Sequence, residues 1–275
     1  MRKALHVVGL FAATALTLGF LVLPLAALFT RQSPVELVHQ LSNPVVTDAL
    51  KLSVVTSAIA QALILLLGTP TAYLVATRRF PGRSLVVTLV ELPLVLPPAV
   101  AGIGLLVAFG RVGLLGSTFD ALGISVAFNR TAVVLAVAFV ASPLYLRAAI
   151  AAFEALDPNL VAASRTLGAG PVRTFFRVAL PLTSAGLAAG AALSLARGLG
   201  EFGATIMFAG SLQGVTQTLP LAIYAEFDRD FDVAVTISAL FVVITAAILL
   251  SLKLSALWRT SQRTSRSLFA RLSWS

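Results

Sequence analysis

The stretch FEALDPNLVAASRTLGAGPVRTFFRVALP, residues 153–181, lies between two apolar blocks and carries more helix signals than a loop needs. Asp157 can cap a short helix that begins with a proline, and Gly168 or Gly170 can end it. A second amphipathic segment follows over residues 171–179. The stretch therefore predicts short, firmly bounded helices that join two long apolar ones.

The apolar blocks on either side of this stretch belong to a series along the chain. Of the 275 residues, 58% are hydrophobic and 11% are charged, whereas about a quarter of the residues in a soluble domain are charged. Blocks of roughly 20 apolar residues have the length that crosses a bilayer as a helix. The sequence predicts an all-α membrane protein with six transmembrane helices, at about 7–29, 53–76, 85–109, 131–152, 182–200 and 234–255.

The composition excludes several other classes of protein. The chain has no cysteine and two histidines, too few for a disulfide framework or a typical zinc site. A net charge of +9 would suggest nucleic-acid binding in a soluble chain, but here the basic residues flank the apolar blocks and form no single patch. We therefore expect no metal and no nucleic-acid partner.

The positions of lysine and arginine predict the orientation, because positive charge is retained on the cytoplasmic side during insertion. The 20 basic residues divide unevenly between the two sides of the predicted spans. Arg197 lies within a span, and the smaller, outer group is Arg31, Lys51, Arg111, Arg130 and Arg229. The sequence thus predicts a multi-pass membrane protein with both termini in the cytoplasm.

The first apolar block has a second interpretation, as a signal peptide, because Arg2 and Lys3 precede it. It runs past Pro24 to Phe29, which is longer than the roughly 7–15 residues of a signal-peptide core. A retained first helix is favoured.

The predicted outer loop before the last span is acidic. It contains Glu226, Asp228, Asp230 and Asp232. A solvated charge run is the favoured interpretation, and docking of a basic partner is the alternative.

Six helices alone enclose a pathway poorly, so we expect a dimer or a larger assembly. No internal repeat is visible, which argues against a self-contained carrier built from inverted repeats. The fifth span carries small residues four positions apart, and such a strip lets two helices approach closely. The partner helix could belong to the same chain or to a second copy. The strip consists of Gly186, Gly190, Ser194 and Gly198.

Residues 162–181 resemble the cytoplasmic signature of the inner-membrane permeases of binding-protein-dependent ABC importers. That signature reads Glu-Ala-Ala, three residues, Gly, nine residues, Ile-x-Leu-Pro. Here Ala162-Ala163-Ser164 takes the first place, Gly168 follows after three residues, and nine more lead to Val178-Ala179-Leu180-Pro181. The leading glutamate is missing, so any role tied to it stays open.

This resemblance implies the type I ABC importer permease fold. It also implies a cytoplasmic coupling helix at about 158–170 that docks into a separate ATPase subunit. The residues expected at this contact are Ala162, Ala163, Ser164, Arg165, Gly168, Ala169, Leu180 and Pro181.

Further stretches resemble the molybdate and sulfate branch of the same family. They are LPLVLPPAVAG (92–102), ARGLGEFGAT (196–205) and TQTLPL (216–221), and the run GATIMFAG (203–210) is most similar to molybdate permeases. The resemblance covers residues 48–255. It implies molybdate as the transported ion, with sulfate and tungstate as alternatives because these dianions differ mainly in size.

Prolines mark a candidate transport pathway. Pro93, Pro97 and Pro98 remove backbone donors from the third span and should bend it. Irregular backbone at membrane depth is tolerated where it is buried or lines a watery cavity, so this span should border the pathway. Pro70 and Pro143 could act likewise or could be simple packing kinks.

Arg197 and Glu201 lie one helical turn apart near the outer end of the fifth span. Ionisable groups within a span pair with each other or face water, so a mutual ion pair is the first interpretation. Contact of Arg197 with a passing oxyanion is the alternative. If the two residues only pair, exchanging them should largely preserve transport.

The apolar stretch 204–209 is too short to cross the membrane, and it should turn near the outer surface. The family resemblance implies that this region helps to close an external gate. Met207 and Phe208 could form an apolar constriction that excludes hydrated ions, or they could pack against neighbouring spans.

Nothing in the sequence supports catalysis. The phosphate-binding pattern Gly-x4-Gly-Lys-Ser/Thr is absent, and the two histidines, His6 and His39, complete no catalytic set. We expect no cofactor on this chain, with ATP and Mg bound by the ATPase subunit.

The leading hypothesis is a molybdate permease that works with a second copy of itself, two cytoplasmic ABC ATPase subunits, an external molybdate-binding protein and membrane lipid. A secondary anion carrier is the alternative from another class. The expected division is an N-terminal helix and outer loop (1–47), the permease domain (48–255) and a basic cytoplasmic tail (256–275).

Overall fold

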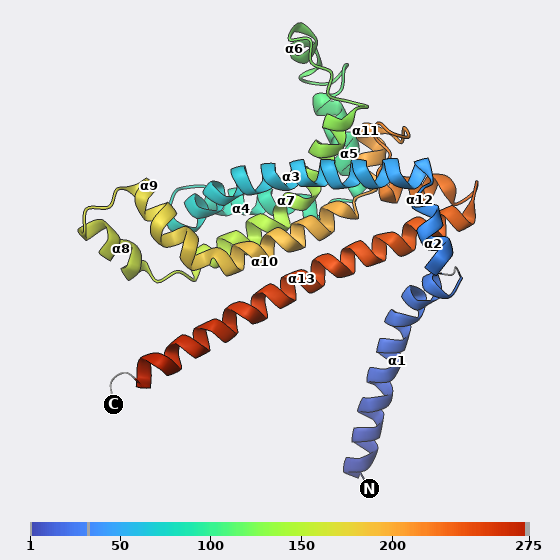
Figure 1. The fold of residues 1–275 in the computed structure, drawn as a ribbon. Helices are drawn as coiled ribbons and strands as arrows, with labels where there is room; N and C mark the ends of the chain where they lie inside the picture. Colours follow the sequence, from blue (N-terminus) through green and yellow to red (C-terminus); the bar gives the residue numbers. More distant parts are fainter. Residues whose placement is uncertain (1, 32–33, 273–275) are drawn as a thin grey trace.

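The computed structural model describes residues 2–31 and 34–272, and these residues form helices joined by loops and turns. The long helices α3 (Pro44–Thr77), α7 (Arg130–Glu154) and α10 (Leu180–Leu199) lie side by side and form the body of the molecule (Figure 1). Within these described residues, five helices have the length and apolarity to cross a membrane, or six if one bent pair counts as a single span.

The central helix α7 packs against both α3 and α10. It begins at Arg130 because the side-chain oxygen of Asn129 accepts a hydrogen bond from the backbone N–H of Ala132, at 3.1 Å. Many of its buried residues are alanine and valine, whose short side chains allow helix backbones to approach closely.

The small-residue strip of α10 faces α7 of the same chain. A Cβ atom built on Gly186 would lie 2.7 Å from the Cβ of Ala152, and one on Gly190 would lie 2.7 Å from the Cβ of Ala148. Both distances are shorter than real carbon contacts. The strip therefore belongs to packing within one chain, which decides between the two interpretations left open by the sequence.

The expected third span, 85–109, is not one continuous helix. It consists of α4 (Arg83–Val95) and α5 (Pro98–Phe109), which are bent by 115° relative to each other. The break falls at Leu96 and Pro97, because Pro97 and Pro98 in succession donate no backbone hydrogen bonds. The proline-induced bend was predicted correctly, and its size, 115°, was not.

Helix α5 leaves the bundle to one side and leads to α6 (Gly116–Ala121) at the tip of the projection (Figure 1). By contrast, Pro70 and Pro143 lie inside α3 and α7, which continue through them. These two prolines therefore do not break their helices.

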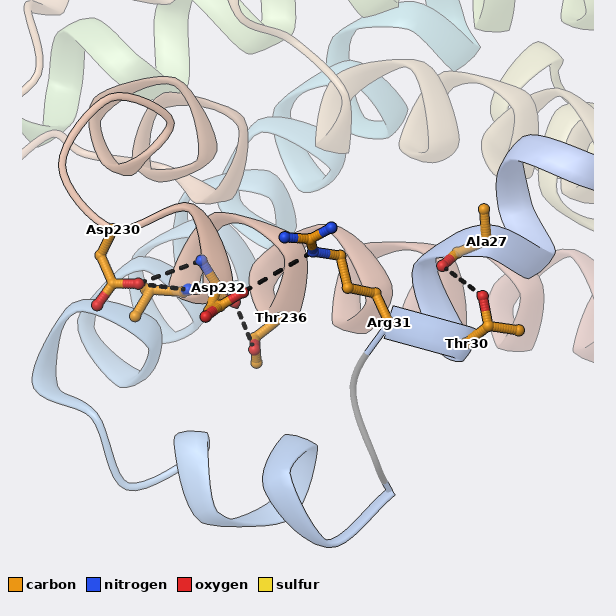
Figure 2. Close-up of polar contacts among 7 residues, drawn as sticks. Ala27, Thr30, Arg31, Asp230, Asp232 and Thr236 are labelled. Carbon is orange, nitrogen blue, oxygen red and sulfur yellow. Dashed lines mark hydrogen bonds and ion pairs between the residues drawn. The ribbon is translucent and has the colours of Figure 1, made fainter.

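Helix α1 (Arg2–Arg31) diverges from the bundle and approaches α13 (Phe231–Leu272) near the start of α13 (Figure 1). There Arg31 Nε lies 3.9 Å from Asp232 Oδ1 (Figure 2). The Arg31 guanidinium also lies 5.1 Å from the centre of the Phe231 ring. In the single chain, the window of α1 that qualifies as a span has no buried residue.

The acidic residues of the loop before α13 form contacts within the chain. Asp230 Oδ1 accepts hydrogen bonds from the backbone N–H groups of Asp232 and Val233, and so caps α13 (Figure 2). Glu226 pairs with Arg229 at 3.6 Å. Three of the four acidic residues thus have partners in their own chain.

Short helices lie at the two ends of the bundle. The end that carries the 153–181 stretch holds α8 and α9, and the other end holds α2 and α12 (Figure 1). Their bounds are Pro34–Gln40 for α2, Pro158–Thr166 for α8, Pro171–Thr174 for α9, Gly203–Ala209 for α11 and Leu219–Glu226 for α12.

Candidate coupling segment and gate

The predicted short helix of the 153–181 stretch is α8. Its first turn is capped by Asp157, whose Oδ1 accepts a hydrogen bond of 2.9 Å from the N–H of Asn159. Gly168 ends it with a φ of 83°, the left-handed conformation that favours glycine. Gly170 has a φ of −67°, so Gly168 is the stop signal. The helix is shorter than the expected 158–170 because the chain turns at Gly168.

The outward surface of this segment combines small, basic and apolar side chains. Ala162, Ala163 and Arg165 are exposed, while Ala169 is half-buried. Large apolar side chains are exposed as well, and Leu167 reaches 88%. Exposed apolar groups at a rigid end of a molecule are typical of a contact surface for another protein. The other large ones are Leu160, Val172 and Phe176.

The inner side of the segment is attached to the long helices. Ser164 Oγ lies 3.2 Å from Thr174 Oγ1, and Thr174 is fully buried. The next residue, Phe175, stacks at 4.9 Å on Tyr73 of α3, which also contacts Phe153 of α7 at 5.3 Å between ring centres. Hydrogen bonding and aromatic packing therefore connect α8 to two long helices.

A π-helical segment, η1 (Phe175–Ala179), joins α9 to α10. The N–H of Leu180 donates to the carbonyl of Phe175, five residues back. The next residue, Pro181, has no N–H to continue an α-helical ladder through this point. Leu180 and Pro181 thus form the first turn of α10, directly after an irregular joint.

Arg197 and Glu201 form the ion pair that their spacing predicted. Arg197 Nη1 lies 2.8 Å from Glu201 Oε2, and the Glu201 side chain is 1% exposed whereas that of Arg197 is 33% exposed. The sequence did not predict a second bond: Glu201 Oε1 accepts the N–H of Ala204 at 2.7 Å. Glu201 therefore connects the end of α10 to the first turn of α11.

The two candidate gate residues of α11 have different surroundings. Met207 is 42% exposed, whereas Phe208 is fully buried in the core with Leu105 and Val133. For Phe208 the structure agrees with packing against neighbouring spans. Met207 remains the exposed apolar side chain that could face a pathway.

Helices α5 and α11 are in close contact through one glycine from each. A Cβ atom on Gly102 would lie 2.6 Å from the carbonyl oxygen of Ala204 and 2.7 Å from the Cβ of Met207. On Gly203, it would lie 2.8 Å from the Cβ of Pro98. Pro98, the first residue of α5, is therefore pressed against α11, while Pro93 lies within α4 and Pro97 at the break.

A polar contact between α3 and α10 was not predicted from the sequence. Ser194 Oγ donates a hydrogen bond of 2.9 Å to Gln61 Oε1. Gln61 is an amide in an otherwise apolar block, and such residues commonly hydrogen-bond across helices in membranes. That polarity was the available signal, but the identity of its partner required the fold.

The chain is similar in sequence to known transport proteins over most of its length. Residues 64–259 match the family model described as binding-protein-dependent transport system inner membrane component. The molybdenum transport system permease protein ModB of Mycobacterium bovis is 44% identical over 231 residues, which cover 84% of this chain and 88% of that protein. The probable transport system permease protein NifC of Clostridium pasteurianum is 36% identical over 245 residues, covering 89% and 86%.

A solved structure has the same fold at low sequence identity. It is the crystal structure of a bacterial alginate ABC transporter in complex with an alginate pentasaccharide-bound periplasmic protein. The match has a TM-score of 0.73 at 17% identity and covers 91% of this chain and 93% of the other. Together with the family match, this identifies the chain as a multi-pass inner-membrane protein that belongs to the family of inner membrane components of binding-protein-dependent transport systems.

Proposed function

We propose that this chain is the permease subunit of an ATP-driven molybdate importer. The observation that carries the proposal is the 44% identity, across 84% of the chain, to a protein named as a molybdenum transport system permease. In this proposal, two copies form the pathway, two cytoplasmic subunits bind ATP and Mg and hydrolyse the ATP, and an external binding protein delivers the ion. This chain itself has no catalytic role.

The proposed topology counts α4 and α5 as one bent span, which gives six spans and both termini in the cytoplasm. The excess of arginine around α8 and α9 supports this orientation, because positive charge is retained inside. Helix α8 then lies in the cytoplasm, and its exposed apolar side chains Leu160 and Leu167 are available to the ATPase subunit.

At the opposite end, α11 is proposed to belong to the external gate. The exposed Met207 is the candidate gate side chain, and α5, which begins after the Pro97 break, supports α11 through Gly102. Arg197 is a third exposed, so it can offer positive potential to a passing dianion while Glu201 holds it in place.

The proposal is tested by the ATPase activity of the reconstituted complex in proteoliposomes with its binding protein. We expect molybdate-loaded binding protein to stimulate hydrolysis, with tungstate and sulfate compared at equal concentrations. Stimulation by sulfate alone would mean that the transported ion is sulfate and not molybdate. No response to any of the three ions would overturn the proposed function.

Replacing Gly168 with tryptophan should abolish this stimulation while leaving the spans folded. The φ of 83° at Gly168 costs a residue with a Cβ about 1–2 kcal/mol, so the end of α8 must rearrange. A bulky side chain would also stand on the proposed docking surface. Stimulated ATPase activity and binding of the ATPase subunit are the measurements.

Gly82→Trp is the matched control, because Gly82 has a φ of 85° and, like Gly168, open space around its Cβ position. It lies before α4, outside the proposed docking segment. We expect the control to retain stimulated hydrolysis. Unchanged coupling in Gly168→Trp would refute the docking assignment for α8.

A further inference from the structure

Two ion pairs join α4 and α7, and neither was predicted from the sequence. Arg147 Nε lies 3.1 Å from Glu91 Oε1, and Arg83 pairs with Glu154 at the ends of the same two helices. Arg83 also donates from Nε to the carbonyl of Val75 in α3, at 2.8 Å. We call Arg83, Glu91, Arg147 and Glu154 the α4–α7 ladder.

The spacing of the ladder suits two antiparallel helices. Seven or eight residues separate the charges on each helix, a rise of about 10–12 Å at 1.5 Å per residue. On both helices the arginine precedes the glutamate in the sequence, so the antiparallel arrangement places opposite charges beside each other. A slip of two turns would bring Arg83 toward Arg147 and place like charges together, so the ladder specifies one register of α4 on α7.

The inner pair, Glu91 and Arg147, lies within segments that qualify as membrane-spanning. Their side chains are 41% and 59% exposed in the single chain. Charged groups at such positions are costly unless they are paired. An ion pair without a structural role would not need to lie within a membrane-spanning segment. The position of this pair therefore points to a role in fixing α4 to α7.

The two ends of the ladder lead to the two functional ends of the molecule. Helix α7 ends at Glu154, three residues before Asp157, the cap of α8. Helix α4 leads through the Pro97 break into α5, which contacts α11 at Gly102. A continuous set of contacts therefore runs from the coupling segment to the gate without passing along α10.

We propose that Glu91 and Arg147 are positioning residues for transport: they make α4 move with α7, so that displacement of α8 by the ATPase subunits is passed through α5 to α11. This inference rests on the proposed function of the chain as a permease. It adds a second route by which displacement of α8 can reach the gate helix α11, beside the covalent route through α10 and Glu201.

The test is a charge reversal followed by a charge exchange in the reconstituted complex. Glu91→Arg brings a second guanidinium against Arg147 and should lower transport about tenfold or more, within the range of typical coupling between sites. ATPase activity stimulated by the binding protein should persist. Adding Arg147→Glu restores an opposite-charge pair and should restore the number of ions transported per ATP.

The ratio of transport to hydrolysis separates positioning from simple stability. If the pair only stabilised the fold, the single variant would lose assembled complex, transport and hydrolysis together, and that result would refute the proposal. An equal number of ions transported per ATP in the wild type and in Glu91→Arg would also refute it. The control is Asp120→Arg, which replaces an exposed ion pair of 3.6 Å outside the ladder with two neighbouring arginines, Arg111 and the introduced one. It should leave the ratio of transport to hydrolysis unchanged.

A second measurement keeps this inference separate from the identity of the ion. The chain has no cysteine, so Met207→Cys introduces a single thiol on α11. Vanadate traps nucleotide on the ATPase subunits. In a chain that is otherwise wild type, this trapping should change the rate at which a membrane-impermeant maleimide labels the introduced thiol. In Glu91→Arg the change should be smaller, because only the route through α10 and Glu201 remains, and in the exchanged pair it should return to the wild-type size. This readout holds whichever anion the complex transports, and a nucleotide response of wild-type size in Glu91→Arg would refute the second route.

Discussion

Glu201→Ala should abolish transport and greatly reduce the amount of folded complex. Removing this carboxylate leaves the Arg197 guanidinium without its partner at 2.8 Å and the N–H of Ala204 without its acceptor at 2.7 Å. Loss of one member of a fully buried ion pair costs about 3–5 kcal/mol, and the cost here should be smaller because the Arg197 side chain is 33% exposed. Loss of the acceptor for the N–H of Ala204 adds about 1 kcal/mol. The measurement is the fraction of complex that stays monodisperse in detergent after heating, together with transport.

The controls for Glu201 separate its two bonds. Glu201→Gln keeps an acceptor for the N–H of Ala204 but removes the charge, so it should retain more folded complex than Glu201→Ala. Asp120→Ala, in an exposed ion pair, should change stability by no more than about 1 kcal/mol. A Glu201→Ala complex as stable and active as the wild type would contradict the structural role of this residue.

The structure changes the expected result of exchanging Arg197 and Glu201. The sequence suggested that the exchange should preserve transport if the two residues only pair. However, arginine has no acceptor atom, so an arginine at position 201 cannot receive the N–H of Ala204. Loss of activity in the exchanged chain would therefore not by itself indicate an anion contact at Arg197.

Gly102→Val should separate α5 from α11 and abolish transport. A Cβ atom at this position would lie 2.6 Å from the carbonyl oxygen of Ala204 and 2.9 Å from its Cα. These are backbone atoms and cannot rotate away, so one helix must move. Overpacking of this kind costs about 1–3 kcal/mol, and here the strain falls on the proposed gate helix. Transport and detergent stability of the purified complex are the measurements.

Gly104→Val is a closely matched control for Gly102→Val. Gly104 lies on the same helix, and a Cβ atom there would meet nothing within 4 Å. We expect this variant to assemble and transport like the wild type. Normal transport by Gly102→Val would contradict tight α5–α11 packing in the working state.

Local signals in the sequence predicted helix positions well. Asp157 caps α8 and Gly168 ends it, because caps and stops depend on a few adjacent residues. The Arg197–Glu201 pair could be predicted in the same way, since residues four apart on a helix are neighbours. What the sequence could show was therefore mostly short-range.

Contacts between distant segments could not be predicted in the same way. The residues near Glu91 in the sequence do not indicate Arg147 as its ion-pair partner. Those near Gly102 do not indicate that it packs against Ala204. The 115° bend between α4 and α5 also depends on what α5 packs against, since prolines predict a break but not its angle. The gate and the ladder are tertiary features for this reason.

The α4–α7 ladder also bears on how the protein is made. Glu91 is synthesised before α5, α6 and α7, so its partner Arg147, near the end of α7, is made only later. A carboxylate without a partner is disfavoured in the hydrocarbon interior. We therefore expect α4 to take its final place in the membrane only after α7 has been made.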